Sequence, residues 1–320
     1  MNASSTASGT SIPRRSRYRK LAKIVLLVFL CIFILFGVGL WYASSQLLFP
    51  VWKSGDNGDL RSTHEFKFND VRFLSTNGYE LPGWLIRATE NGMGPAQGAV
   101  MLVHGGGMDR RSETKFIRFF LERRLDVLTF DQSGQGEAPG PVPGLTYGTR
   151  ESRDVLSAYL YLSGKYEKVY AMGTSVGAAS ILIALPEMPG LAAVIAENPM
   201  VSFQKLILET PASKSIPNWF TNLLIRLTMI RGKFDGLESP EHSLRLVTST
   251  PIYFIHSKKD NIVPYQQTKE LAESYKGPKT VWFPEMGNHA AIWEIDHADY
   301  EKRLSDFLNN VQKTLPLTMK

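Results

Sequence analysis

Cysteine is almost absent from this chain of 320 residues, in which Cys31 is the only example. A single thiol excludes an internal disulfide framework and a zinc site built from several cysteines. Because Cys31 lies within an apolar stretch, a catalytic thiol is not expected either. Internal repeats of roughly 20–50 residues are also missing, which excludes a solenoid or a propeller.

Acidic residues are missing from the chain before Asp56. Six basic residues lie before residue 24: Arg14, Arg15, Arg17, Arg19, Lys20 and Lys23. Without them, the 36 Lys and Arg residues fall to 30, which equals the number of Asp and Glu residues. The formal net charge of +6 therefore belongs to the N-terminal segment. The rest of the chain is neutral, so a nucleic-acid-binding domain is not expected.

Residues 24–43 contain no charged residue and read as a transmembrane helix. A helix of about 20 residues spans the roughly 30 Å hydrocarbon core of a bilayer. Trp41 and Tyr42 lie at its far end, where aromatic side chains favour the membrane interface. The basic residues on the near side predict a cytoplasmic N-terminus, residues 1–23, and a body on the outer side of the membrane.

A cleaved signal peptide is the alternative, because Ala43, Ser44 and Ser45 form a stretch of small residues. The apolar region of a signal peptide usually has about 7–15 residues, which is shorter than this one. The length therefore favours an uncleaved anchor, followed by a linker over residues 44–64.

The body alternates short apolar runs with helical patterns. The turn signal Asn77-Gly78 predicts an antiparallel hairpin at the start. Alternating strands and helices predict an α/β fold, a mostly parallel sheet with helices on both faces. The expected strands are Val71–Leu74, Tyr79–Ala88, Ala99–His104, Leu125–Phe130, Lys168–Met172, Ala192–Ala196, Pro251–His256 and Thr280–Phe283. The expected helices are Lys115–Arg124, Arg150–Ser163, Val176–Leu185, Gln266–Ser274 and Ala290–Lys313.

Residues 199–250 interrupt this alternation. They contain several large apolar side chains and three prolines, Pro211, Pro217 and Pro240, with no clear strand pattern. A helical insertion fits this pattern best. Ligands of such sheets bind at the carboxyl ends of the strands, so the insertion is well placed to form a lid over a pocket, and a plain surface elaboration is the alternative.

Gly173-Thr174-Ser175-Val176-Gly177 follows a predicted strand and precedes a predicted helix. In that context a G-x-S-x-G sequence places the serine hydroxyl on a sharp turn at the sheet edge. Its glycines keep side chains out of the turn, and the helix N-terminus offers N–H groups to a developing oxyanion. Ser175 is therefore the candidate nucleophile.

His104-Gly105-Gly106-Gly107 follows an earlier strand. Glycines let the backbone approach a ligand and present N–H groups to it. The N–H groups of Gly105 and Gly106, with that of Val176, are the candidate oxyanion hole. A phosphate-binding loop is disfavoured, because no G-K-[ST] sequence follows.

Asp260 and His289 follow the last two predicted strands. A serine hydroxyl needs a base, which would be His289, and an acid that orients this base, which would be Asp260. The chain order Ser175, Asp260, His289 is typical of one hydrolase architecture. Glu197, at the end of an earlier strand, is the alternative acid.

These motifs together resemble the α/β-hydrolase superfamily over residues 65–315, in its serine esterase, lipase and peptidase-like branch with a short lid. Further likeness lies in Asp131–Gly136, Tyr147-Gly148 with Glu151 and Asp154, Ser239-Pro240 and Pro251–His256. Three residues depart from the family pattern: Ser133 stands where many members have Arg, Glu137 where many have Ser, and Ser257 where Gly is usual. The first two leave open how the Asp131–Gly136 loop is held.

The resemblance implies a serine hydrolase that needs neither a metal nor an organic cofactor. We expect a membrane-anchored enzyme that cleaves an ester, in preference to an amide or thioester, through an acyl-enzyme. The apolar insertion and the anchor favour a lipid or other apolar acyl substrate. The alternatives are an acyltransferase with the same three residues and a non-catalytic binding protein that keeps the fold.

Overall fold

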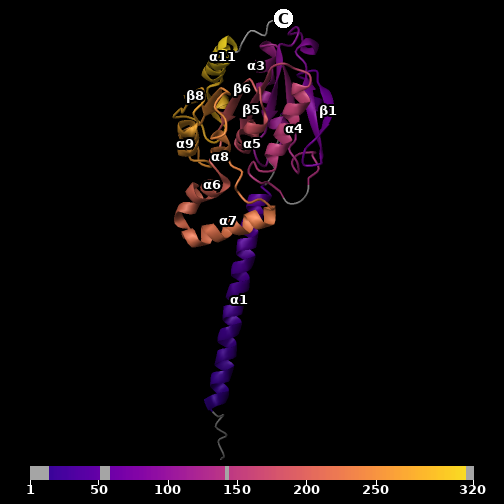
Figure 1. Cartoon of the computed structure of the whole chain (residues 1–320). Coiled ribbons are helices and arrows are strands. Elements are labelled where there is room, and N and C mark those ends of the chain that lie inside the picture. Colours follow the sequence, from indigo (N-terminus) through magenta and orange to yellow (C-terminus); the bar gives the residue numbers. More distant parts are fainter. Residues whose placement is uncertain (1–13, 51–57, 141–143, 315–320) are drawn as a thin grey trace, which may run out of the picture. The chain divides into compact units, whose positions relative to one another are not determined.

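The computed structural model describes residues 14–50, 58–140 and 144–314 (Figure 1). The chain forms two compact units that meet between Ser44 and Ser45. The first unit contains most of the helix α1 (Arg14–Leu48). The part of this helix from Tyr18 to Leu48 has a mean hydropathy of 3.0 in its most apolar window. By length and composition it could cross a membrane. The span expected at residues 24–43 lies inside this helix.

The second unit is built on an eight-stranded sheet of order β1-β2-β4-β3-β5-β6-β7-β8. β1 and β2 form an antiparallel hairpin, β2 is antiparallel to β4, and the remaining neighbours are parallel. The strands are β1 (Asn69–Leu74), β2 (Glu80–Ile86), β3 (Gly98–Val103), β4 (Leu125–Phe130), β5 (Val169–Thr174), β6 (Ala193–Glu197), β7 (Ile252–Ile255) and β8 (Lys279–Trp282). All eight strands lie where the sequence predicts them, within two residues at most ends.

Apolar clusters cover both faces of this sheet. Alternate residues of β3 point to opposite sides, so that Met101 packs in one cluster and Leu102 in the other. One face is covered by α4 (Glu151–Ser163), α5 (Val176–Ala184), α8 (Pro240–Leu244) and α9 (Tyr265–Ser274). The other face is covered by α3 (Ile117–Glu122), α10 (Ile292–Ile295) and α11 (His297–Thr314). A mostly parallel sheet buried on both sides is the predicted fold class.

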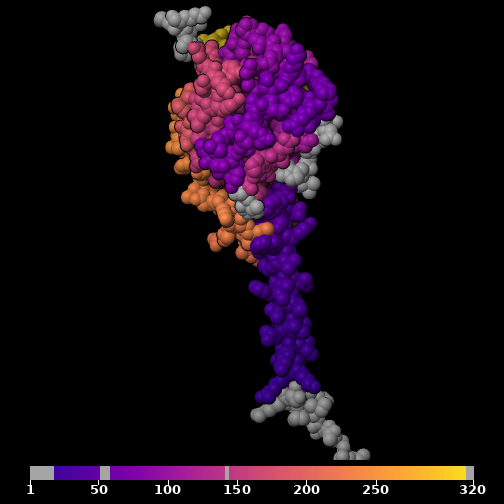
Figure 2. Space-filling model, turned by 90° about the vertical axis from the view of Figure 1, so that its right-hand side faces the viewer, coloured from indigo at the N-terminus to yellow at the C-terminus, as the bar shows by residue number. Residues whose placement is uncertain are grey.

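The insertion contains three helical segments before α8. They are α6 (Phe203–Glu209), the 3₁₀ turn η5 (Pro211–Ser215) and α7 (Asn218–Gly232). Pro211 begins η5, and Pro217 precedes α7, because proline suits the first turn of a helix. In the space-filling view the orange atoms of this insertion stand out from the lower side of the second unit (Figure 2).

Two expected helices are divided in the structure. The segment expected at Lys115–Arg124 begins earlier, as the 3₁₀ helix η3 (Arg110–Phe116), and continues as α3. The segment expected at Ala290–Lys313 is broken at Asp296, whose φ of −139° and ψ of 64° are not helical. Smaller elements are α2 (Leu60–Thr63), η2 (Thr89–Asn91) and η4 (Leu185–Glu187). Leu48 and Leu60, from the segment expected as a linker, are buried in this unit.

Candidate active site

Ser175 stands on a strained turn between β5 and α5. Its φ of 54° and ψ of −116° lie in a region that side-chain-bearing residues rarely adopt. Both flanking glycines are required here, because their surroundings leave no room for a Cβ. A Cβ on Gly177 would overlap the carbonyl oxygens of Val103 and His104, and one on Gly173 would lie 2.7 Å from the carbonyl carbon of Gly177. This strained, tightly packed turn matches what the G-x-S-x-G sequence predicts.

His289 and Asp260 are brought together by adjacent parallel strands. Asp260 follows β7 and His289 follows β8, which pairs with β7. The Nδ1 atom of His289 lies 2.6 Å from Oδ2 of Asp260. The two loops are also joined through Asn288, whose Oδ1 accepts the N–H of Asn261 at 3.1 Å. When Nδ1 of His289 donates its hydrogen in this bond, Nε2 remains as the nitrogen that can accept a proton.

The carboxylate of Asp260 is fully buried and surrounded by donors. Burial alone would raise its pKa, but hydrogen bonds from His256 and His289 outweigh burial and hold the pKa well below its usual range. His256 and Asn198 were not singled out by the sequence. The other contacts of the carboxylate are Asn198 Nδ2 at 2.6 Å, Ile262 N at 2.8 Å, Val263 N at 2.9 Å and His256 Nε2 at 3.0 Å.

Glu197 does not contact His289. Its side chain is fully buried, and its Oε2 accepts a hydrogen bond from Tyr300 at 3.2 Å. Burial raises the pKa of this carboxyl group, which favours the neutral form. Its backbone carbonyl, by contrast, accepts the N–H of Ser175 at 2.8 Å. The geometry therefore pairs Asp260 rather than Glu197 with the histidine, while the catalytic roles stay predictions.

Ser175 and His289 line one cavity of about 610 Å³. The glycine turn also lines this cavity, with Gly105 close to the Cβ of Ser175. A side chain at Gly106 would overlap Leu145 and Val176, so the turn passes close to the N-terminus of α5. The turn and the helix N-terminus thus meet beside the serine, as an oxyanion hole requires.

One wall of the cavity is charged. Lys115 Nζ lies 2.6 Å from Oε1 of Glu294, and its ammonium group faces the rings of Phe116 and Trp293 at 5.1 and 5.8 Å. Behind it lies Glu113, which is 3% exposed and whose pKa burial raises to about 7. Sequence patterns missed this wall, because nothing in the spacing of these residues points to the serine.

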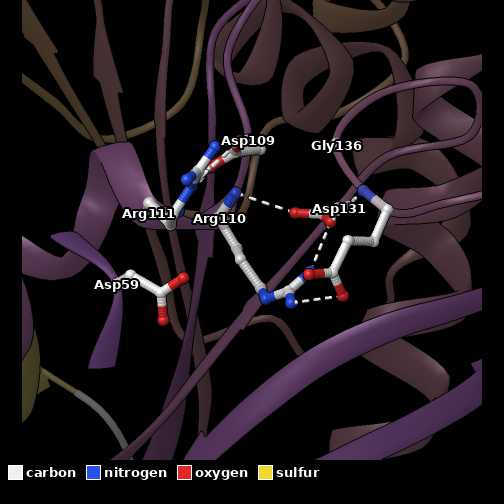
Figure 3. A pocket seen from close by; sticks show the side chains of 7 residues that line it. Asp59, Asp109, Arg110, Arg111, Asp131 and Gly136 are labelled. Carbon is white, nitrogen blue, oxygen red and sulfur yellow. Dashed lines mark hydrogen bonds and ion pairs between the residues drawn. The ribbon is translucent and has the colours of Figure 1, made fainter. Parts of the chain in front are cut away.

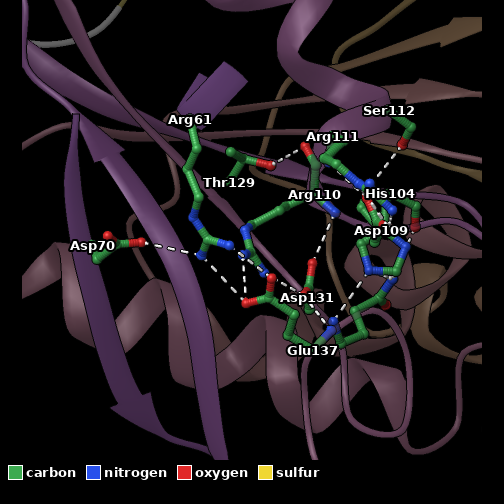
Figure 4. A network of polar contacts seen from close by, with 11 residues as sticks. Arg61, Asp70, His104, Asp109, Arg110, Arg111, Ser112, Thr129, Asp131 and Glu137 are labelled. Carbon is green, nitrogen blue, oxygen red and sulfur yellow. Dashed lines mark hydrogen bonds and ion pairs between the residues drawn. The ribbon is translucent and has the colours of Figure 1, made fainter. Parts of the chain in front are cut away.

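The loop after β4 is held by side chains from elsewhere in the chain. Asp131 accepts the backbone N–H of Arg110 at 2.9 Å and of Glu137 at 2.7 Å, and it also pairs with the Arg110 guanidinium (Figures 3 and 4). Glu137 in turn binds Arg110 and Arg61, each at 2.8 Å. Hydrogen bonds from Arg61 and then Arg110 lower the pKa of Glu137 to about 2.

This network explains the departures at Ser133 and Glu137. Ser133 donates its backbone N–H and its hydroxyl to Asp154, at 2.7 and 2.8 Å. The guanidinium of Arg110 takes the place of the arginine that many family members have at the position of Ser133. One of its nitrogens pairs with Asp131, and the other donates to Glu137. Gln135 then accepts the N–H of Gly107 at 3.2 Å, which links the loop to the glycine turn.

Within the described ranges, no group of three or more His, Cys, Asp or Glu side chains is placed to hold a metal ion.

Comparisons with known proteins agree with this fold. A sequence model of the serine aminopeptidase family S33 matches residues 94–247, which include the Ser175 turn. An esterase from Pyrococcus furiosus, Pf2001, has a similar structure with a TM-score of 0.65 and 19% identity, covering 82% of this chain and 99% of that one. An acylaminoacyl peptidase from Pyrococcus horikoshii has a TM-score of 0.58 and 19% identity, covering 83% of this chain and 45% of that one.

The chain has the α/β-hydrolase fold, and residues 94–247 match the S33 family of hydrolases. Among curated proteins, this α/β-hydrolase is similar to the uncharacterized protein YfhR of Escherichia coli K12, with 24% identity over 93% of this chain and 97% of that one. The uncharacterized protein YqkD of Bacillus subtilis is 25% identical over 74% of this chain and 78% of that one. The match to the S33 family ends before Asp260 and His289, so it does not include these two residues.

Proposed function

We propose that the protein is a membrane-anchored serine hydrolase that cleaves a carboxylic ester. The observation that carries this proposal is one cavity shared by Ser175, on its strained turn, and His289, which is hydrogen-bonded to a buried Asp260. Such an arrangement supports acyl transfer through a covalent serine intermediate. An amide or thioester bond is the lesser alternative.

In the proposed reaction, Ser175 Oγ attacks the carbonyl carbon while His289 Nε2 takes its proton. Asp260, which stays ionised, stabilises the imidazolium. N–H groups of Val176, Gly105 and Gly106 stabilise the oxyanion. His289 then protonates the leaving alcohol, and an acyl-enzyme remains. Water attacks this ester with His289 as the base, which releases the acid and restores the serine.

Covalent labelling tests the nucleophile. We expect a fluorophosphonate probe to modify the detergent-solubilised full chain at Ser175 and to leave a Ser175→Ala variant unmodified. Ser112→Ala is a matched control, because Ser112 lines the same cavity but stands on η3. Labelling that persists in Ser175→Ala, or that is absent from a folded wild-type preparation, contradicts the proposal.

A substrate panel separates the alternatives. Short soluble esters, emulsified acyl glycerides and peptides are compared, with alcohol and amine acceptors added to detect acyl transfer. Lys115 and Glu294 would lose hydration against a purely hydrocarbon group. Among lipid and other apolar acyl substrates, we therefore expect the highest activity on acyl groups that carry a polar substituent near the ester. Equal inactivity on all lipids would remove the lipid hypothesis. Products with an acceptor other than water would identify an acyltransferase.

The membrane anchor and its orientation form part of this proposal. The apolar helix and the six basic residues before residue 24 support a cytoplasmic N-terminus with the hydrolase on the outer side. A reporter fused after Lys320 is expected to be active outside the cytoplasm. A cytoplasmic signal would reverse the orientation.

A further inference from the structure

One stretch of the insertion carries basic side chains only. Residues 210–234 include four basic side chains, Lys214, Arg226, Arg231 and Lys233, and no acidic one. In the described structure, Lys214, Arg226 and Lys233 form no ion pair. This stretch of the insertion, which lies between Glu209 and Asp235, is therefore purely basic, whereas basic and acidic residues balance over the body as a whole.

The helix α7 has two opposite faces. Its inner face consists of the buried residues Thr221, Ile225, Thr228 and Gly232. The outer face carries Trp219, Leu223, Arg226 and Ile230, whose spacing of four, three and four residues places them on one stripe. Trp219 is 64% exposed and Ile230 is 76% exposed. An outer stripe of large apolar side chains with cations beside it is typical of a helix that lies in a membrane interface.

The chain enters the folded unit beside α7. Ser45 is the first residue of this unit, and its hydroxyl lies 2.9 Å from the guanidinium of Arg231. Leu48 is fully buried, with its Cδ2 against Gly232, the last residue of α7. Only two residues separate Tyr42, at the end of the proposed membrane span, from Ser45. Covalent connection thus brings the bilayer surface near the insertion.

We propose that the outer stripe of α7 docks on the membrane surface and that its cations bind anionic lipid headgroups. The apolar side chains enter the boundary between headgroups and acyl chains, and the four cations are attracted to anionic headgroups in the leaflet that the catalytic unit faces. Docking at this interface fixes the orientation of the catalytic unit on the bilayer. The proposal rests on the membrane anchor and does not depend on the reaction at Ser175.

Site-directed labelling of the full chain tests the docking. With Cys31 replaced by serine, a fluorophore is attached at Leu223→Cys or Ile230→Cys, and one chain is placed in each lipid nanodisc. Nanodiscs contain phosphatidylcholine alone or with phosphatidylglycerol, together with a spin-labelled lipid as quencher. Leu74→Cys, on β1, is the matched control, because Leu74 is also an exposed leucine, at 70%. Labelling of the native Cys31 reports the anchor itself.

We expect quenching at Leu223→Cys and Ile230→Cys but not at Leu74→Cys, and stronger quenching with the anionic lipid. Arg226→Gln should lower the ratio of docked to undocked chains about fivefold, because one cation near an anionic surface contributes roughly that factor. Lys313→Gln, on α11, removes an exposed cation elsewhere and should change nothing. Both helices are labelled in Figure 1, at opposite ends of the body.

Absence of quenching at both α7 positions, with Cys31 quenched, overturns the docking. Quenching that is equal in neutral and anionic nanodiscs overturns the role of the cations. Shielding of the labels only in vesicles that hold many chains would assign the stripe to a second copy of the protein and also overturn the proposal. If the label on Cys31 is not quenched, the N-terminal helix is not inserted in the bilayer, and the proposed membrane anchor is wrong.

Discussion

Two buried carboxyl groups lie near Ser175, and they differ in charge. Asp260 is reached by donors from two histidines, one asparagine and two backbone amides, and its pKa lies below the usual range. Glu197 is equally buried but accepts one hydrogen bond, from Tyr300, and its Oε1 has no partner among the described residues. Burial raises its pKa.

The difference shows that burial alone does not decide the charge of a carboxyl group. The number of donors that face it decides whether the ionised form is stabilised or the neutral form is retained. Only an ionised acid can stabilise an imidazolium, so the donors around Asp260 fit it for that task. Glu113, whose pKa is raised to about 7, lines the cavity with Lys115, and the charge of Lys115 acts on both Glu113 and the buried Glu197.

The largest effect is expected from Asp260→Asn. Oδ1 accepts two backbone amides, so the new NH₂ group would replace Oδ2 and face His289 Nδ1. The histidine would then accept at Nδ1 and carry its hydrogen on Nε2, which is the wrong tautomer for a base. We expect kcat to fall on the order of 10⁴-fold.

Glu197→Gln is the matched control for that change, since it also replaces one carboxylate oxygen by an amide in a buried site. A neutral carboxyl group resembles an amide in charge, so we expect ester turnover within about threefold of wild type. The measurement is single-turnover kinetics with a soluble ester. A larger loss in Glu197→Gln than in Asp260→Asn would reverse the comparison and make Glu197 the catalytic acid.

The next effect concerns stability, through Glu113→Gln. Because the pKa of Glu113 is about 7 in the folded protein and 4.5 for an ordinary glutamate, this group ionises first in the unfolded chain as the pH rises. The free energy of unfolding of the wild type therefore falls as the pH rises from about 4.5 to 7. Below about pH 4.5 this contribution of Glu113 to stability is fully present. The glutamine variant does not titrate, so we expect it to gain about 3 kcal/mol relative to wild type between pH 4.5 and 8.

Urea unfolding in detergent at the two pH values measures this gain. The pH dependence of stability that arises from Asp260 runs in the opposite direction. Because the pKa of Asp260 is lowered in the folded protein, its contribution to stability is present above the unfolded pKa and is lost as the pH falls. An unchanged difference between Glu113→Gln and wild type at the two pH values would show that Glu113 is already ionised in the folded protein.

Much of the fold and part of the site follow from sequence patterns. Most strands were predictable because they are short apolar runs, and the first hairpin because of its turn signal Asn77-Gly78. Ser175 was predictable because glycine is required on both sides of its turn. Asp260 and His289 were found from their places after the last strands. The roles of His256 and Arg110 were not predicted. Each of them binds a carboxylate, Asp260 or Asp131, and only folding brings these side chains together. The charged wall at Lys115 was missed for the same reason.

His256 provides a smaller test of the donor argument. Its Nε2 faces two acceptors, Asp260 Oδ2 at 3.0 Å and Val263 O at 2.9 Å, so this nitrogen carries a hydrogen. His256→Leu removes that donor and should lower kcat about tenfold, with KM unchanged, because Asp260 is less firmly oriented. His256→Gln keeps an N–H group at a similar position and should restore most of the rate. Equal losses in both variants would indicate a packing role only.

The smallest effect is expected at the charged wall. The ammonium group of Lys115 lowers the pKa of Glu113 and of Glu197, in opposition to burial. Lys115→Met removes this charge, so we expect the pKa of Glu113 to rise by on the order of one. Infrared difference spectra of the protonated carboxyl group across the pH range measure the change. Lys258→Met is the control, because Lys258 pairs with the exposed Glu285 and does not line the cavity. A fall in the pKa of Glu113 would mean that the ionised form is stabilised by donors rather than by Lys115, and the contrast with Asp260 would then disappear.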